Sequence, residues 1–243
     1  MSEHFPAPAA AAPLVVFDFD HTLCDGDAGT GFYRWLIGRA WWRGLLALLV
    51  APVAGPMLAF LPTRKRGISA FVWAGSVGER LSLDALIDRY VALHETKLRA
   101  SALPIALAVF AEHRHKGDRV VVATGAPPRL ARAILERVAG DADLPVLGTE
   151  LGPGCGGLVV ARHCHHAMKL AMLRDAGFTQ PVAVAYSDSS ADLPLLQTAQ
   201  HPVVVNPKPA RVALFRRVLP PGTPILHWGC PGRAGARGQG EAE

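Results

Sequence analysis

Residues 14–22, with the sequence LVVFDFDHT, constrain the fold more than any other segment of this chain. An apolar run rich in valine and phenylalanine is typical of a buried parallel strand. Asp18 and Asp20 stand at its end, and the alternation of an extended chain directs both side chains to the same side. Open α/β sheets bind their ligands at the carboxyl ends of the strands. We therefore expect the two carboxylates to face a ligand crevice.

The close spacing of these carboxylates has two interpretations. Like charges this close favour a bound cation, and oxygen ligands suit Mg²⁺. A carboxylate beside such an ion can also attack phosphorus and form an aspartyl-phosphate. Acids that follow a strand, however, often only cap the next helix or turn. The rest of the chain has to decide between these roles.

Downstream of this strand, the pattern predicts strands that alternate with helices. Residues 25–116 show helical periodicity, clearest at residues 81–98, where Ser82 is the expected N-cap. Further strands are expected at residues 119–124, around 146, 158–161 (half of a small hairpin), 182–186 and 203–205, with helices at 129–138 and 166–176. This order predicts an α/β fold with a doubly wound, mostly parallel sheet and a helical cap inserted after the first strand. The predicted parts are a disordered lead at 1–13, a catalytic core at 14–24 and 117–219, a cap at 25–116, and a flexible tail at 220–243.

Three further polar signals fall at or just beyond the predicted strand ends: Thr124-Gly125, Lys169, and the run Asp188-Ser189-Ser190-Ala191-Asp192. Each has an ordinary explanation, because Thr124 can be an N-cap, a lone Lys169 is usually solvated, and the acids can cap a turn. Their succession at strand ends favours one shared site. A hydroxyl, a helix N-terminus, a cation and a further carboxylate are the groups that phosphoryl transfer needs.

These motifs resemble those of the haloacid dehalogenase superfamily of aspartate-dependent phosphohydrolases, and the resemblance covers residues 14–207. It implies that Asp18 is the nucleophile and that Asp20 is the general acid and then the base. Thr124, Gly125 and Lys169 would bind the phosphoryl group. Mg²⁺ would be held by the Asp18 carboxylate, the Asp20 carbonyl and Asp188, and Asp192 would orient this set. The helical insertion resembles subfamily IB, the branch that includes phosphoserine phosphatases.

Two positions depart from this pattern or have a second interpretation. His21 stands where the family frequently has glycine. Asp27 falls where the family often has an acid that faces the substrate, although it can equally begin a helix. The cluster at residues 163–166, His-Cys-His-His, does not follow the ligand spacing of a zinc site, so we do not expect it to bind zinc.

The cap contains an apolar segment, residues 44–63, without a single charged residue. Basic residues flank it on both sides: Arg39, Arg43, Arg64, Lys65 and Arg66. Since the site residues come from both sides of the segment, its two ends must lie on the same side of any membrane. Pro52, Gly55 and Pro56 are expected to bend it into a re-entrant or interfacial helical hairpin at the cytoplasmic face of a bacterial inner membrane. The alternative is a buried helix pair in the cap of a soluble cytoplasmic enzyme.

The charge balance favours an anionic partner. The formal net charge is +5, which suits phosphate esters or lipid headgroups. Nucleic acid is disfavoured, because the aromatic residues do not alternate with basic ones in a stacking pattern.

The cap and the sequences Phe71-Val72-Trp73-Ala74-Gly75 and Tyr186-Ser187-Asp188-Ser189 are similar to the phosphatidylglycerophosphatase C family. This resemblance implies hydrolysis of the phosphomonoester of phosphatidylglycerophosphate in phospholipid biosynthesis. The alternatives are a soluble small-molecule phosphatase of the phosphoserine phosphatase type and a catalytically idle lipid-binding protein.

Overall fold

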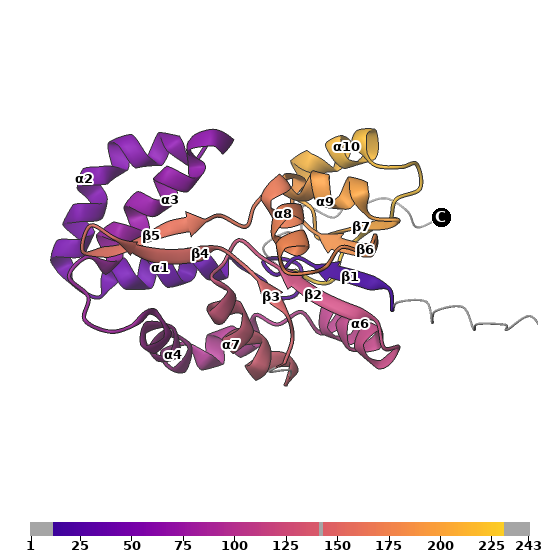
Figure 1. Cartoon of the computed structure of the whole chain (residues 1–243), viewed down its shortest axis with the longest axis horizontal. Coiled ribbons are helices and arrows are strands. Elements are labelled where there is room, and N and C mark those ends of the chain that lie inside the picture. The colour runs from indigo at the N-terminus through magenta and orange to yellow at the C-terminus, as the bar shows by residue number, and fades with distance from the viewer. Residues whose placement is uncertain (1–11, 141–142, 231–243) are drawn as a thin grey trace, which may run out of the picture.

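The structure is a computed structural model that describes residues 12–140 and 143–230. Its centre is a sheet of six parallel strands in the order β3-β2-β1-β6-β7-β8 (Figure 1). The strands are β1 (Leu14–Phe17), β2 (Arg119–Ala123), β3 (Val146–Leu147), β6 (Val182–Ser187), β7 (His201–Val205) and β8 (Ile225–Leu226). The chain order changes direction on either side of β1, so the carboxyl end of β1 lies at the switch point where such sheets bind ligands.

Helices cover both faces of the sheet, as the burial of β1 requires. Val15 and Phe17 belong to one apolar core with residues of α6 (Pro104–His115) and α7 (Pro128–Ala139). Leu14 and Val16 belong to a second core with residues of α8 (Ala167–Asp175), α9 (Leu193–Thr198) and α10 (Pro209–Val218). Successive side chains of β1 thus pack alternately into the two hydrophobic cores, one on each face of the sheet. This architecture confirms the predicted doubly wound parallel α/β fold.

The long insertion between β1 and β2 is helical. It contains α1 (Ala28–Gly38), α2 (Trp41–Met57), α3 (Leu61–Ser76), α4 (Leu83–Leu93) and α5 (Glu95–Ala100), followed by α6. Figure 1 shows α2 and α3 side by side and extending away from the sheet. Gly67 permits this approach, since a Cβ atom there would lie 2.8 Å from the carbonyl oxygen of Ala54.

A β-hairpin from the core holds this cap. β4 (Glu150–Gly154) and β5 (Gly157–Arg162) are antiparallel, and β5 lies along α3. The backbone N–H groups of Leu158 and Val160 donate to the hydroxyls of Ser76 and Ser69 on α3, at 2.8 and 3.0 Å. These bonds satisfy one edge of the hairpin and fix α3 relative to the core.

Two parts of the fold differ from the predicted ranges. Phe110 of α6 packs edge to face on Phe17 at 5.4 Å, so α6 lies with the sheet rather than with the cap that was predicted to reach residue 116. β8 and the buried Trp228 and Cys230 lie in the range predicted as a flexible tail. Both depend on tertiary packing, which local composition does not reveal. Residues 1–11 and 231–243 of the predicted lead and tail lie outside the described residues.

The predicted position of the hairpin turn, at the prolines of the apolar segment, is wrong. α2 continues through Pro52 and Pro56 to Met57, and the chain turns at residues 58–60 before α3 begins at Leu61. The two prolines are four residues apart on one exposed face, where water can solvate the carbonyl groups that lose their helical partners. The hairpin therefore consists of α2 and α3.

In the part of the chain that the structure describes, no helix has by itself the length and apolar character to cross a membrane. The α1–α2 pair meets both criteria together, but its two helices are bent by 120° relative to each other.

Candidate active site

A cavity of about 460 Å³ lies where the strand ends meet the cap. The predicted residues that line it are Asp18, Asp20, Asp27, Gly125, Lys169, Asp188 and Asp192. Leu58, Arg64 and Ile68 of the α2–α3 hairpin line it from the cap. The structure thus brings together residues that are up to 174 positions apart in the sequence, as the strand-end argument expects.

Asp18 follows β1 directly and is buried beside Lys169. The Lys169 ammonium, only 2% exposed, donates to Asp18 Oδ1 at 2.8 Å and to Asp192 Oδ2 at 2.6 Å. Ser187, the last residue of β6, donates to the same Asp192 oxygen at 2.7 Å. Lys169 is therefore fixed between two carboxylates, with one of them positioned by Ser187.

Burial and charge oppose each other at Lys169. Burial alone would lower the pKa of its ammonium, but Asp18 and Asp192 outweigh this effect, so the pKa is raised and the group stays charged. A buried cation in contact with two acids can neutralise charge on a phosphoryl group that enters the cavity.

Asp20 lies over the start of α1 and beside Thr124. The backbone N–H of Ala28 donates to Asp20 Oδ1 at 2.7 Å, and the Thr124 hydroxyl lies 3.5 Å from Asp20 Oδ2. Burial, and then the charge of Asp27, raise the pKa of Asp20 to about 7. A carboxyl group with such a pKa can both donate and accept a proton near neutral pH.

Thr124 is not the N-cap of α7, which is Pro127, but its hydroxyl fixes the turn before that helix and lies beside Asp20. Its hydroxyl accepts from the backbone N–H of Ala126 at 3.0 Å, at the turn that leads into α7. Gly125 lines the cavity itself. The backbone at this helix entrance is therefore placed to meet phosphate oxygens.

The acidic cluster fits a divalent cation. Burial raises the pKa of Asp18 well above its usual range; Lys169 lowers it, and the charges of Asp192, Asp188 and Asp20 raise it further. Asp188 is also buried and lines the same cavity. Carboxylates crowded in a buried site need positive charge, and an all-oxygen donor set matches Mg²⁺. Asp18, Asp188 and the Asp20 carbonyl are the groups that would hold the ion.

Asp27 fulfils the simpler of its two expected roles and still faces the cavity. Its carboxylate caps α1 by accepting from the Thr30 N–H at 2.6 Å. It also lines the cavity and raises the pKa of Asp20. A substrate contact of Asp27 stays a prediction.

The histidine cluster forms part of the cavity wall. The rings of His163 and His165 are stacked at 5.1 Å, and His163 Nδ1 lies 2.9 Å from the Thr149 hydroxyl. Burial lowers the pKa of both histidines to about 4. The neighbouring His165 lowers the pKa of His163 further, and Arg64 lowers that of His165 further. Both rings are therefore neutral near pH 7.

Sequence reasoning missed three basic residues near the site. Arg64 Nη1 lies 2.9 Å from His165 Nε2, and Arg64 lines both the main cavity and an adjacent one of about 400 Å³. Lys208, at the start of α10, also lines both, and Arg211 lines the second. Arg64 was visible only as a flank of the apolar segment, and the other two lie in no recognised motif. Arg64 meets the other two only because the chain turns between α2 and α3.

Known proteins resemble this chain in both sequence and fold. Protein CicA of Caulobacter vibrioides (strain NA1000 / CB15N) is 27% identical over 197 residues, which cover 76% of this chain and 82% of that protein. Phosphoserine phosphatase SerB1 of Mycobacterium tuberculosis (strain ATCC 25618 / H37Rv) is 26% identical, with 83% and 71% covered. A solved phospho-aspartyl intermediate analogue of a phosphoserine phosphatase superposes with a TM-score of 0.54 at 16% identity, covering 91% of this chain and 96% of that one.

The family assignment rests on a match to a protein family rather than to a single protein. Residues 15–197, most of the chain, match the family of haloacid dehalogenase-like hydrolases. The match begins in β1 and ends in α9, so it includes every element that supplies a predicted carboxylate or Lys169. This chain belongs to the family of haloacid dehalogenase-like hydrolases.

Proposed function

We propose that this protein is a Mg²⁺-dependent phosphomonoesterase that works through an aspartyl-phosphate at Asp18. The observation that carries the proposal is the buried Asp18 carboxylate, held 2.8 Å from Lys169 at the floor of the cavity. A buried carboxylate with a fixed cation beside it is equipped to act as a nucleophile towards a phosphoryl group whose charge the cation balances.

The chemistry proceeds in two displacements. In the first, Asp18 forms a bond to phosphorus while the bond to the leaving alkoxide breaks, and Asp20 donates a proton to that alkoxide. In the second, Asp20 takes a proton from water, which attacks the phosphoryl group and releases Asp18 and inorganic phosphate. Bound Mg²⁺ would supply charge stabilisation and orientation for the phosphoryl oxygens.

The Asp18→Asn variant tests this mechanism. It removes the nucleophile but keeps the shape of the side chain, so we expect loss of turnover and of phosphoenzyme trapping with a labelled substrate. Unchanged circular dichroism and thermal unfolding would show that the fold persists. Removal of divalent cations with a chelator should also stop turnover, and Mg²⁺ should restore it. Turnover by Asp18→Asn at the wild-type rate would refute the mechanism.

A small phosphomonoester with a second anionic group, such as phosphoserine, is the first candidate substrate. Two of the proteins similar to this chain are phosphoserine phosphatases by name. The cavity next to the site also supports it, because Arg64, Lys208 and Arg211 line that cavity together. Within the described residues, none of these three cations forms an ion pair with a carboxylate, so their charge is available to a second anionic group of the substrate.

A lipid phosphomonoester, such as phosphatidylglycerophosphate, is the second candidate, and the surface of α2 favours it. An exposed apolar stripe runs along this helix at helical spacing, formed by Trp41, Leu45, Leu48, Leu49 and Val53. α2 buries only Arg43 and Ala54, so the expected alternative of a buried helix pair does not describe it. A continuous apolar face of this kind is uncommon on a monomer that contacts only water.

The turn of this hairpin lies next to the active site. Phe60 and Leu61 at the turn are exposed, whereas Leu58 and Arg64, within three residues of them, line the main cavity. Lys65 and Arg66 are also exposed beside the turn. If this turn inserts into an anionic membrane, the membrane surface would therefore lie close to the entrance of the cavity. This candidate locates the enzyme at the cytoplasmic face of the membrane, and the first locates it in the cytoplasm.

A substrate screen separates the candidates. Hydrolysis of phosphoserine in the absence of lipid would support the first, and hydrolysis of phosphatidylglycerophosphate in anionic vesicles would support the second. Phosphatidate serves as the lipid control without the glycerol phosphodiester. Failure to hydrolyse any phosphomonoester with Mg²⁺ supplied would instead support a catalytically idle lipid-binding protein.

A further inference from the structure

Three side chains with good metal-binding atoms gather beside Asp20; two of them are on the loop that follows it, and one of these, His21, also lines the main cavity. They are His21, Asp25 and Cys230, and their ligand atoms all lie within 4.8 Å of one another. His21 Nδ1 is 3.3 Å from Asp25 Oδ1, and Cys230 Sγ is 2.9 Å from that oxygen and 3.7 Å from Nδ1. The phosphatase mechanism has no role for Asp25 or Cys230.

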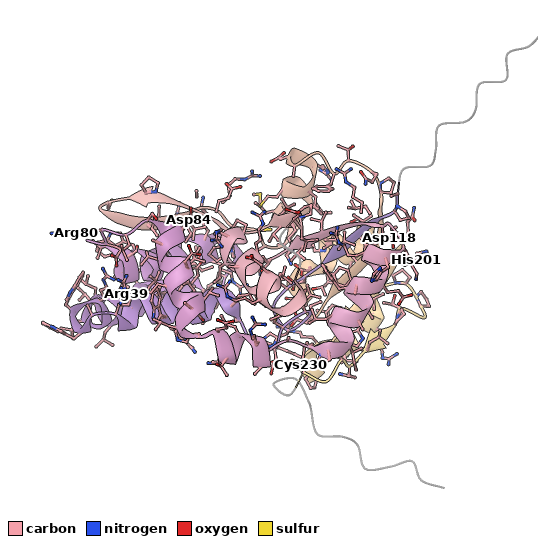
Figure 2. The ribbon with its side chains drawn as sticks, turned by 90° about the horizontal axis from the view of Figure 1, so that it is seen from below. Arg39, Arg80, Asp84, Asp118, His201 and Cys230 are labelled. Carbon is pink, nitrogen blue, oxygen red and sulfur yellow. The ribbon has the colours of Figure 1, made fainter. Side chains whose placement is uncertain are left out.

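The fold holds this cluster from both sides. Buried Asn206, at the end of β7, donates to the His21 carbonyl at 2.9 Å and accepts from the Trp228 N–H at 2.7 Å. One side chain therefore ties the loop after β1 to the segment that carries Cys230. Figure 2 shows Cys230 at an edge of the molecule, as the last described residue. His21 has a φ of 55°, a strained conformation for a residue other than glycine, and its ring lies within this cluster.

The lone pair of His21 Nδ1 accepts a hydrogen bond in this structure, and a metal ion would replace that donor. The backbone N–H of Gly26 donates to His21 Nδ1 at 3.2 Å, so this nitrogen is the acceptor of a neutral imidazole. The Cys230 thiol donates its proton to Asp25. On metal binding, the ion would take the place of the Gly26 N–H at Nδ1, and the thiol proton would pass to solvent as Cys230 becomes a thiolate.

The spacing of the three atoms matches tetrahedral coordination. A triangle with sides of 2.9, 3.3 and 3.7 Å has a circumradius of about 1.9 Å, so an ion about 0.8 Å above its plane is about 2.1 Å from each corner. Zinc bonds to nitrogen and oxygen have this length, and the bond to sulfur is about 2.3 Å, which requires a small outward movement of Cys230. The fourth position is left for water or another ligand.

We propose that His21, Asp25 and Cys230 form a second metal site, specific for a divalent transition ion of the zinc type. Its nitrogen, oxygen and sulfur donors suit Zn²⁺, whereas the all-oxygen set at Asp18 and Asp188 suits Mg²⁺. The ion would fix the loop between Asp20 and Asp25 to the C-terminal segment at residue 230. Zinc would thereby stabilise the loop that carries the proposed general acid.

Cobalt spectroscopy on the full chain tests the site directly. Saturating Mg²⁺ first occupies the oxygen-rich site, and Co²⁺ is then titrated. We expect one Co²⁺ per chain with a thiolate charge-transfer band in the near ultraviolet and intense d–d bands in the visible, which indicate tetrahedral geometry. Cys230→Ser should abolish the charge-transfer band, and Asp25→Asn should weaken binding. Cys155→Ser, at an exposed cysteine, is the matched control and should leave the spectrum unchanged.

Zinc competition and stability give the second readout. Zn²⁺ should displace Co²⁺ and raise the Tm of the wild type and of Cys155→Ser, but not of Cys230→Ser. The loss of a direct ligand should weaken zinc binding by more than about 100-fold, beyond the 10–100-fold of an outer-shell change. The proposal is overturned if wild-type protein shows no charge-transfer band, or if Cys230→Ser binds zinc as tightly as Cys155→Ser. None of these readouts depends on phosphatase activity, so they are independent of the proposed function.

Discussion

Replacement of Leu48 and Leu49 by glutamate tests whether the exposed face of α2 binds a membrane. The two side chains are 70% and 75% exposed, so a membrane can still remove most of their surface from water. Complete burial of one leucine contributes about 2 kcal/mol. Because only the exposed 70–75% of each side chain remains to be buried, insertion of both contributes about 3 kcal/mol. This corresponds to a factor of roughly 100 in the partition coefficient. The L48E/L49E variant should therefore bind vesicles at least about 100-fold more weakly than wild type.

The assay is co-sedimentation with vesicles, with phosphatidylglycerol vesicles compared with neutral ones. The matched control is L93E/I105E, which adds the same charge at residues that are 63% and 51% exposed on α4 and α6, outside the hairpin. We expect this control to bind as wild type does. Thermal unfolding should change little for either variant, because all four side chains already face water. Wild-type protein that stays in the supernatant, or equal losses for both double variants, would refute the membrane-binding argument.

Three further predictions concern the site. Asp192→Asn should lower kcat by roughly 10–100-fold with little change in KM, since it removes a charged hydrogen bond to Lys169; unchanged steady-state kinetics would contradict its positioning role. Lys208→Ala/Arg211→Ala should raise the KM for phosphoserine by at least about tenfold but leave p-nitrophenyl phosphate unaffected, because only phosphoserine has a second anionic group. The pKa of His163 is lowered to about 4 in the folded state, so the unfolded chain takes up this proton first as the pH falls below about 6.5. The wild type should lose about 1 kcal/mol at pH 5 through this group, allowing for solvent screening. His163→Gln should lack this loss in urea unfolding at pH 7 and pH 5, and a slope equal to that of wild type would contradict the assignment.

The sequence predicted those features that depend on local pattern. β1 was recognisable because four buried apolar residues lead directly into Asp18, and a parallel sheet then requires the other strand ends to lie beside it. The Ser82 cap was predicted for the same reason, because the cap hydrogen bond to the Ala85 N–H forms within one turn of helix.

The missed features depend on contacts between distant segments. β8 has only two residues, and its pairing with β7 uses the carbonyls of Pro224 and Leu226 rather than any periodic pattern. Arg64 enters the cavity because the chain turns after Met57, and the prolines that were expected to make that turn lie within the helix instead. A proline can end a helix, or it can lie on the solvent-facing side of a helix that continues. The sequence does not distinguish these cases unless it is known which side of α2 faces the core.

The second cavity provides a physical distinction between the two substrate candidates. Leu61, at the exposed turn of the hairpin, lines this cavity together with Arg64, Lys208 and Arg211. An anionic group bound by the three cations would lie in the same space as an apolar side chain that extends towards solvent. A free amino acid phosphate uses only the charged part of this arrangement. A phospholipid uses both parts, because its headgroup phosphodiester would meet the cations while Leu61 and Phe60 contact the acyl region. The exposed tip and the basic cavity would therefore both contact the substrate only if it is a lipid. In that case Lys208→Ala/Arg211→Ala should weaken vesicle binding as well as raise the KM.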